Sequence, residues 1–239
     1  MNKKTNMLRW FRRDPKFLTE RRQFLSEAVA DYPLYQPPHR QGPNYLRRVQ
    51  NQKEDEHIRL FHEFMARGEE NFQFFLEQRP ARLAALYAFL DKFSVKASLD
   101  DTGLSSVSAW LPGNGCALIG DPRNEAIVQA FHQMQTPWTQ SLRGFNVVFD
   151  FGIFLGEALI ARQPRLRWKL RLGLSEKGES ASTGCSLEGF LMMGQGTHLD
   201  PPQRIFGECW NEVNMLSSRQ PRFMNSNLLV GIVRDFSTR

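Results

Sequence analysis

The order of hydrophobic and polar residues predicts helices over most of the chain. Apolar residues between positions 58 and 75 recur at spacings of three, four and seven, which places them on one face of a helix. This stripe predicts a long helix over 45–78. Pro80 predicts its end, because proline lacks the amide hydrogen that a helix interior needs. A second helix over 81–96 would then pack against the first as a helical hairpin.

Start signals and apolar spacing predict the other helices. Asp14-Pro15 fits an N-cap followed by a first helical position, and the prolines within 33–44 predict an irregular linker after that helix. Asp121-Pro122 repeats the same start signal. Residues 112–121 read as a turn, and 228–233 fit either a strand or a helix. Helices are expected over 100–111, 122–135, 137–162 and 204–217.

The spacing of apolar residues changes from a helical to a strand pattern after residue 164. Residues 165–172 alternate strictly between cationic and apolar side chains, which is typical of a strand with one buried face. The stretch 185–193 is apolar enough to be the returning strand. The chain is therefore predicted to be α+β, mostly helical with a small antiparallel sheet.

Composition places the chain among globular proteins, with 41% hydrophobic and 12% aromatic residues. Its 239 residues allow one large core. The proline-rich stretch separates a basic N-terminal helix from the remainder. We therefore expect an N-terminal segment and linker over 1–44 and a single globular α+β domain over 45–239.

The cysteines and the apolar stretches bear on the compartment. Cys116, Cys185 and Cys209 cannot all pair within one chain, which fits a reducing environment. No apolar signal region follows the basic start, and the run 145–160 is too short to span a bilayer. We expect a cytoplasmic protein without a transmembrane segment.

The net charge of +6 is concentrated near the N-terminus. Residues 1–50 hold 11 Lys and Arg against 4 Asp and Glu, whereas the other 189 residues hold 20 against 21. A near-neutral majority argues against a nucleic-acid surface over the whole domain.

Two basic regions are candidates for binding. Cations interleaved with aromatic residues near the N-terminus suit contact with phosphates and bases, or a helix on a membrane surface or in a partner's groove. The cationic strand face suits an acidic surface, although such charges also discourage association between sheet edges. The candidate residues are Arg9, Trp10, Arg12, Arg13, Lys16, Arg21, Arg22, Arg165, Arg167, Lys169 and Arg171.

Catalytic and metal-binding motifs are absent from the sequence. His57 and His62 are five apart and would diverge on a helix, and no H-E-x-x-H or C-x-x-C occurs. The glycine-rich stretch 112–115 lacks the residues of a phosphate loop. We expect no cofactor and no metal.

A nucleophilic site stays open as an alternative. His198 and Asp200 lie close together in a loop, and Cys185 or Cys209 could approach them in space to form a Cys/His pair. Inert buried cysteines are the ordinary alternative.

Two carboxylates and two glycines stand on the predicted helix over 137–162. Asp150 and Glu157 are seven apart, so they share a face, and we interpret them as partners for Arg162 or the basic strand rather than as an acid–base pair. Gly152 and Gly156 indicate close packing inside the domain.

The stretch FDFGIFLGEALIARQPRLRW, residues 149–168, resembles a segment of uncharacterised bacterial proteins. The shared features are a helix with a Leu-Gly-Glu core and a following strand with Trp, and the resemblance covers about 20 of the 239 residues. It implies a bacterial protein of unknown function and transfers no catalytic residue. The residues that carry it are Asp150, Gly152, Leu155, Gly156, Glu157, Leu159, Ile160, Pro164, Leu166 and Trp168.

The sequence therefore favours a non-enzymatic interaction protein of adaptor, regulatory or immunity type whose partner is another protein. A nucleic-acid-binding accessory protein that uses the two basic regions is the first alternative. An enzyme with an unrecognised Cys/His site is the second. Nothing in the sequence indicates an oligomeric state.

Overall fold

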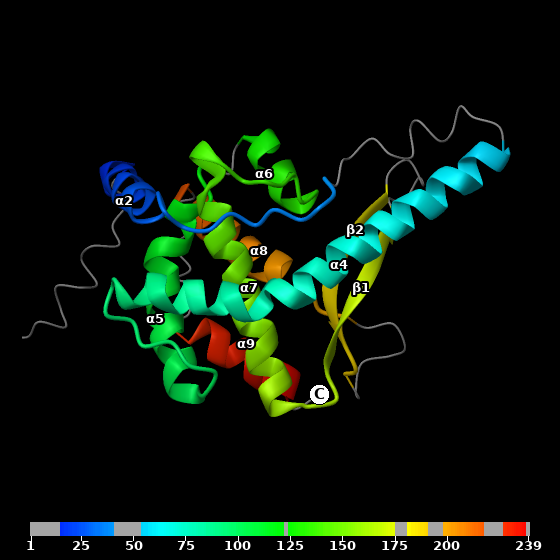
Figure 1. Cartoon of the computed structure of the whole chain (residues 1–239). Coiled ribbons are helices and arrows are strands. Elements are labelled where there is room, and N and C mark those ends of the chain that lie inside the picture. Colours follow the sequence, from blue (N-terminus) through cyan, green and yellow to red (C-terminus); the bar gives the residue numbers. More distant parts are fainter. Residues whose placement is uncertain are drawn as a thin grey trace, which may run out of the picture.

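The computed structural model describes residues 15–40, 54–121, 124–174, 181–190, 198–217 and 227–237. Helices surround one central helix, and a two-stranded hairpin packs at one end (Figure 1). This arrangement confirms the predicted class, α+β with a helical majority and a small antiparallel sheet. The elements are α2 (Pro15–Ala28), α4 (Glu54–Asp91), α5 (Asp101–Leu118), α6 (Glu125–His132), the short 3-10 helix η1 (Gln140–Leu142), α7 (Gly144–Arg162), β1 (Arg167–Leu174), β2 (Ala181–Glu188), α8 (Pro201–Ser217) and α9 (Leu228–Ser237).

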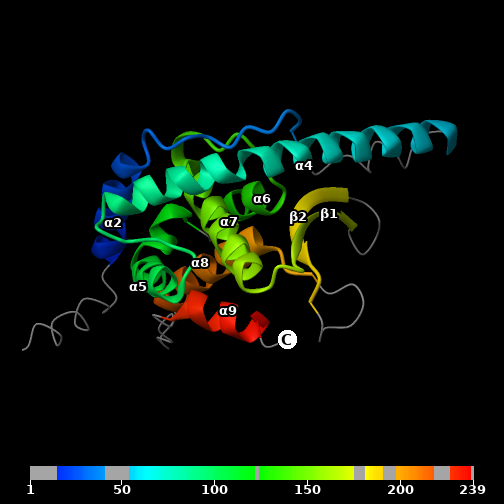
Figure 2. The same cartoon turned by 60° about the horizontal axis from the view of Figure 1, so that its bottom comes forward.

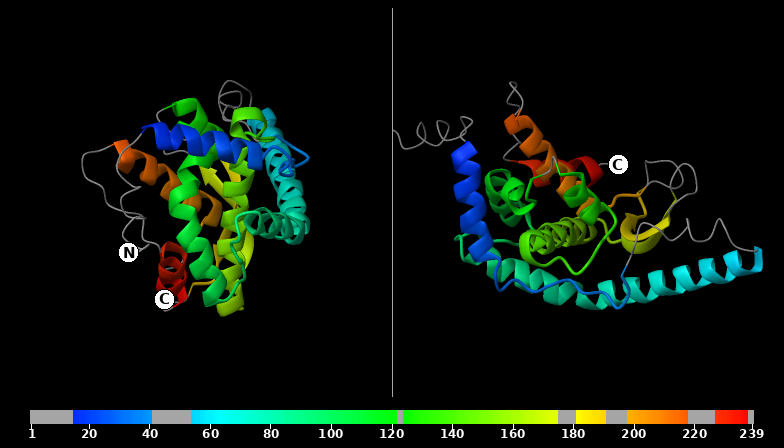
Figure 3. Two further views of the ribbon diagram at one scale, coloured as in Figure 1. Left: turned by 90° about the vertical axis from the view of Figure 1, so that its left-hand side faces the viewer. Right: turned by 90° about the horizontal axis from the view of Figure 1, so that it is seen from above.

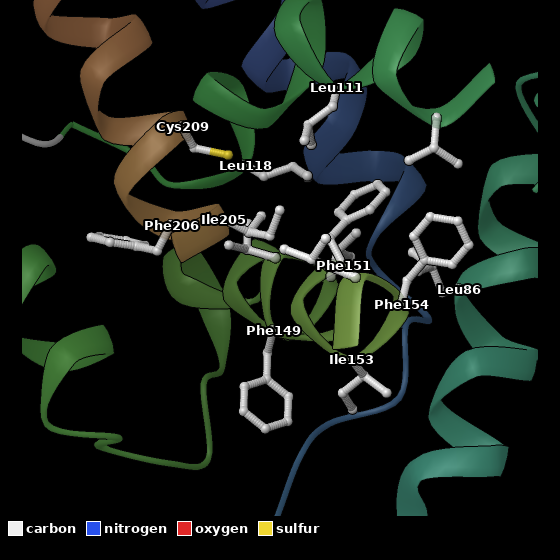
Figure 4. Close-up of a cluster of buried hydrophobic side chains, with 14 of the residues drawn as sticks. Leu86, Leu111, Leu118, Phe149, Phe151, Ile153, Phe154, Ile205, Phe206 and Cys209 are labelled. Carbon is white, nitrogen blue, oxygen red and sulfur yellow. The ribbon is translucent and has the colours of Figure 1, made fainter. Parts of the chain in front are cut away.

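Helix α7 forms the centre of the core. Every residue from Gly144 to Gly156 is buried, because apolar side chains surround this stretch and neighbouring elements cover it on all sides. Phe149 and Ile153 project from one side of α7, while Phe151 and Phe154 project from others (Figure 4). Helices α4, α5, α8 and α9 all contact α7.

The length and apolar composition of α7 would also suit a membrane-spanning helix. The stretch Gln140–Arg162 is long and apolar enough to cross a bilayer, and 83% of its most apolar part is buried inside the structure. The run 145–160, predicted to be too short for a bilayer, is therefore part of a longer helix that continues at both ends. Burial by other helices accounts for this composition, and the described residues contain no other helix of this kind.

Helix α4 corrects the predicted helical hairpin. It passes through Pro80 without a break and extends across the other helices, from α2 to the β-hairpin (Figure 2). A proline in a helix interior costs about 3 kcal/mol. Burial on both sides offsets this cost, since Phe75 and Leu86 are fully inaccessible to solvent.

Helix α5 corrects the predicted turn over 112–121. The helix includes Pro112, Gly113, Asn114 and Gly115, because this stretch lies in the core rather than at the surface. Burial of the flanking apolar residues outweighs the weak helix propensity of these four. Similarly, α6 begins three residues after the predicted start signal, with Asn124 as its cap.

The hairpin agrees with the alternating pattern, with shifted ends. Strands β1 and β2 pair antiparallel from Arg167↔Glu188 to Leu174↔Ala181, and β2 begins four residues earlier than predicted. Trp168 faces the helices, where its ring packs edge-on against Phe75 at 4.9 Å. A side chain on Gly156 would overlap the Trp168 ring, so glycine is required there for the strand to approach α7.

The residue stretch 228–233, which fitted a strand or a helix, is helical and belongs to α9. The loop prediction for 194–202 is corrected at its end, since α8 already begins at Pro201. A side chain on Gly152 would overlap Pro202, so α8 also approaches α7 closely. The two glycines of the G-x-x-x-G pattern thus mark tight packing inside the domain, as predicted.

A buried ion pair joins α4 to α7. The Arg82 and Asp150 side chains are 5% and 0% exposed, with an N–O distance of 2.8 Å. The Tyr32 hydroxyl donates a second hydrogen bond to Asp150 at 2.5 Å. Burial raises the pKa of Asp150 to about 6, and the Arg82 guanidinium opposes that rise. The carboxylate therefore stays ionised at neutral pH.

The same network holds the segment that follows α2. Arg82 also donates to the Pro33 carbonyl at 2.7 Å, and the Tyr35 amide donates to Asn146 Oδ1 at 2.7 Å. Residues 33–40 are irregular, as the prolines predicted, yet Tyr32 and Tyr35 are buried in the common core. The described part of the N-terminal segment is therefore docked, while the predicted boundary at 44 lies outside the described residues.

The buried pair yields a stability prediction. Asp150→Asn leaves the Arg82 charge buried without a counter-ion, so we expect a loss of about 3–5 kcal/mol in the free energy of unfolding. Asp101→Asn is the matched control, because its pair with Arg162 is solvent-exposed on the aspartate side. Its loss should stay below about 1 kcal/mol. Chemical denaturation of both variants measures the free energy of unfolding. Equal losses would contradict a buried pair between Arg82 and Asp150.

Candidate functional site

The outer face of β1 carries a row of three exposed cations, Arg167, Lys169 and Arg171. They alternate with Trp168 and Leu170, which face the helices. Their main chain pairs with β2, but none of the three side chains forms a hydrogen bond or ion pair with another residue in the described part of the chain. At about 3.3 Å per residue the row spans roughly 13 Å. We call these residues the cation row.

The fourth predicted cation does not belong to this row. Arg165 precedes the strand and donates to the Gly189 carbonyl at 3.0 Å and to Gln163 Oε1 at 2.8 Å. These bonds fix the entry into β1, so Arg165 has a local partner and the row is shorter than the sequence predicted.

The N-terminal candidates divide into two sets. Arg21 donates to Asn114 Oδ1 at 2.6 Å, and Arg22 donates to the Gly120 carbonyl. Both side chains therefore hold α2 on α5, at the end of the molecule opposite the hairpin (Figure 3). The structure does not bring them together with the cation row. The remaining candidates lie outside the described residues or, for Lys16, have a side chain that does: Arg9, Trp10, Arg12, Arg13 and Lys16.

A cavity of about 380 Å³ lies on the inner side of the hairpin. Its walls come from the segment after α2, the middle of α4, the end of α6, α7, the hairpin and the start of α8. Phe72, Phe149 and Leu170 supply much of the apolar wall. Asp200, Cys185 and further polar residues complete it. No local motif signals this cavity, because its walls are assembled from six distant parts of the chain.

Asp200 is the carboxylate of the cavity. Its Oδ1 accepts a hydrogen bond from the Gln203 amide at 3.0 Å, which caps the first turn of α8. Burial raises the pKa of Asp200 to about 6, and the charges of Arg171 and His198 oppose this rise. Asp200 is therefore mostly ionised at neutral pH.

The structure brings part of the predicted Cys/His site together. Cys185 and Asp200 line the same cavity, whereas His198 does not line it and Cys209 packs beside Gly115 in the core. Burial raises the pKa of all three thiols well above the ordinary value. Near Cys116 and Cys209, burial also raises the pKa of Glu212 to about 8. This environment opposes formation of a thiolate nucleophile.

The two carboxylates of α7 are ion-pair partners, as interpreted, but their arginines come from α4. Glu157 accepts from Arg79 at 2.5 Å and from the Trp168 indole at 2.7 Å. Arg162 instead binds Asp101 on α5. Glu157 thus anchors the hairpin to α4.

Among the described residues, no group of three His, Cys, Asp or Glu side chains is arranged to hold a metal ion.

The thiol environment yields a second prediction. At pH 7 the folded protein should react with an aromatic disulfide reagent far more slowly than free cysteine does, because little thiolate is present. All three thiols should react rapidly once the chain is unfolded. Rapid reaction of the folded protein that disappears in Cys185→Ser would contradict this prediction. It would favour the alternative of an enzyme with a Cys/His site.

Comparisons with known proteins do not assign this chain to a family. No protein-family model, curated protein or solved structure matches it. The resemblance of residues 149–168 to uncharacterised bacterial proteins therefore stays a prediction. The candidate site has two parts: the cation row on β1, and a cavity between the hairpin and the helices that Arg171 of this row also lines.

Proposed function

We propose that this protein is a non-enzymatic interaction module that binds an acidic region of another protein through the cation row. The observation that carries the proposal is that Arg167, Lys169 and Arg171 are exposed and form no ion pair among the described residues. The other arginines near the hairpin, Arg79 and Arg165, have partners. Like charges along one strand face repel each other, so a bound anionic partner would relieve that repulsion.

Strand topology supports an extended partner. Strand β1 pairs with β2 on one edge, and no described strand pairs with its other edge. A free edge can accept an additional strand through main-chain hydrogen bonds. Acidic side chains at alternate positions of such a strand would lie beside the cation row.

Charge distribution favours protein over nucleic acid as the partner. Beyond residue 50 the chain holds 20 Lys and Arg against 21 Asp and Glu, whereas nucleic-acid-binding domains are usually strongly basic. Arg21 and Arg22, the described basic side chains of α2, are engaged in docking that helix. A row of three cations is a small footprint for a phosphate backbone.

The proposal includes a bacterial, cytoplasmic setting. Its support is the resemblance of residues 149–168 and the presence of three free cysteines, which a reducing compartment would preserve.

Neutralisation of the cation row tests the proposal. A triple variant with Arg167→Gln, Lys169→Gln and Arg171→Gln should bind a fluorescein-labelled peptide of alternating Glu and Thr roughly tenfold more weakly, since three exposed charge contacts contribute about 0.5 kcal/mol each. Fluorescence anisotropy at about 50 mM salt measures the affinity while screening is weak.

The control variant carries Arg40→Gln, Lys92→Gln and Lys96→Gln, which removes the same charge from exposed positions outside β1. It should bind within about twofold of wild type. If both variants lost affinity for the peptide equally, net charge alone would explain the loss, and the proposal would be contradicted. Tighter binding of duplex DNA than of the peptide, falling steeply with salt, would favour the nucleic-acid alternative.

A further inference from the structure

The cavity behind the hairpin has the dimensions of a ligand site. Its volume of about 380 Å³ lies within the range of pockets that hold small molecules. Aromatic side chains form much of its wall. The rings of Tyr35 and Phe149 lie 4.5 Å apart, and Phe72 lines the same space from α4. Such walls suit a compact apolar or aromatic body.

Several polar groups of the wall are already occupied by partners within the protein. Asn71 uses both ends of its amide on the His39 backbone, accepting from its amide at 3.0 Å and donating to its carbonyl at 2.9 Å. Gln203 Oε1 lies 2.6 Å from His132 Nδ1. These contacts fix the wall and leave few groups to orient a ligand.

Asp200 and Arg171 are the charged side chains of the wall, and neither forms an ion pair with a described residue. Asp200 Oδ1 is committed to the cap of α8, whereas Oδ2 accepts no hydrogen bond from a described residue. Gly184 lies opposite, and a side-chain carbon added there would lie 3.7 Å from Oδ2. The glycine therefore leaves space for one group in front of a carboxylate oxygen to which no described residue donates.

We propose that this cavity binds a small organic amine, with its ammonium group at Asp200 Oδ2 and its apolar body packed against Phe72, Phe149 and Tyr35. An ammonium supplies both the missing donor and a counter-charge, and the ring faces attract cations. An anionic ligand would instead face the Asp200 carboxylate. Arg171 also lines the cavity, but its side chain is exposed and forms no ion pair with Asp200, so solvent screens its repulsion of the ammonium group.

Matched probes test the chemistry of the ligand. 2-Phenylethylamine, benzylamine and tryptamine would be titrated into the full-length protein and followed by saturation-transfer NMR. 2-Phenylethanol and 3-phenylpropanoate serve as neutral and anionic counterparts of similar shape. We expect binding by at least one amine and at least tenfold weaker binding by its counterparts, which corresponds to about 1.4 kcal/mol.

Two variants locate the site. Asp200→Asn keeps an N-cap oxygen for Gln203 but removes the charge, and Gly184→Ala places a methyl group before Oδ2 without a clash. Each should weaken amine binding at least tenfold while the melting temperature changes little. Gly207→Ala is the control, because a side chain at that position meets no atom within 4 Å.

The following results would overturn the proposal: equal affinity for the amine and its neutral counterpart, wild-type amine affinity in both Asp200→Asn and Gly184→Ala, or no binding by any amine up to about 10 mM, well above a millimolar dissociation constant. None of these outcomes depends on the peptide that tests the cation row, so the two proposals fail independently.

Discussion

Asp150 constrains the rest of the structure because it is a charged group in the middle of a helix that is otherwise apolar. An isolated buried carboxylate is strongly unfavourable, so the fold must bring it a counter-ion and hydrogen-bond donors. Arg82 and Tyr32 meet this requirement from two other segments. Helix α4, helix α7 and the N-terminal segment are therefore tied together at one point.

The consequences extend along α4 and α7 to the hairpin. Two turns after Asp150, Glu157 forms a second ion pair with α4, to Arg79. It also accepts a hydrogen bond from the Trp168 indole of β1. The hairpin is thereby fixed against α7, where Gly156 allows the indole to approach. The hairpin then closes one side of the cavity and presents the cation row, and Arg171 belongs to both. Tyr35, held through Asn146, supplies another part of the cavity wall.

Local patterns predicted the elements whose signal is local. The strict alternation of residues 165–172 gave the strand and its buried face correctly, and the spacing around Asp150 and Glu157 placed both carboxylates on one helix face. Pro80 and the stretch 112–115 were misread as a helix end and a turn, because burial in the core overrides their low helix propensity.

The candidate site was only partly predictable for the same reason. The cation row follows from the strand pattern, but the engagement of Arg21 and Arg22 with α5 depends on contacts more than ninety residues apart in sequence. The cavity and the open oxygen of Asp200 depend on six segments meeting, which no window of sequence contains.

Native-state hydrogen exchange of the Tyr35 amide tests the central claim that Asp150 and Asn146 hold the N-terminal segment in the core. This amide lies in an irregular segment, but it donates to the buried Asn146 side chain. We predict that it exchanges only through global unfolding, with the same opening free energy as the most protected amides of α7. Exchange at the rate of an exposed loop would show that the segment detaches on its own and would contradict the account.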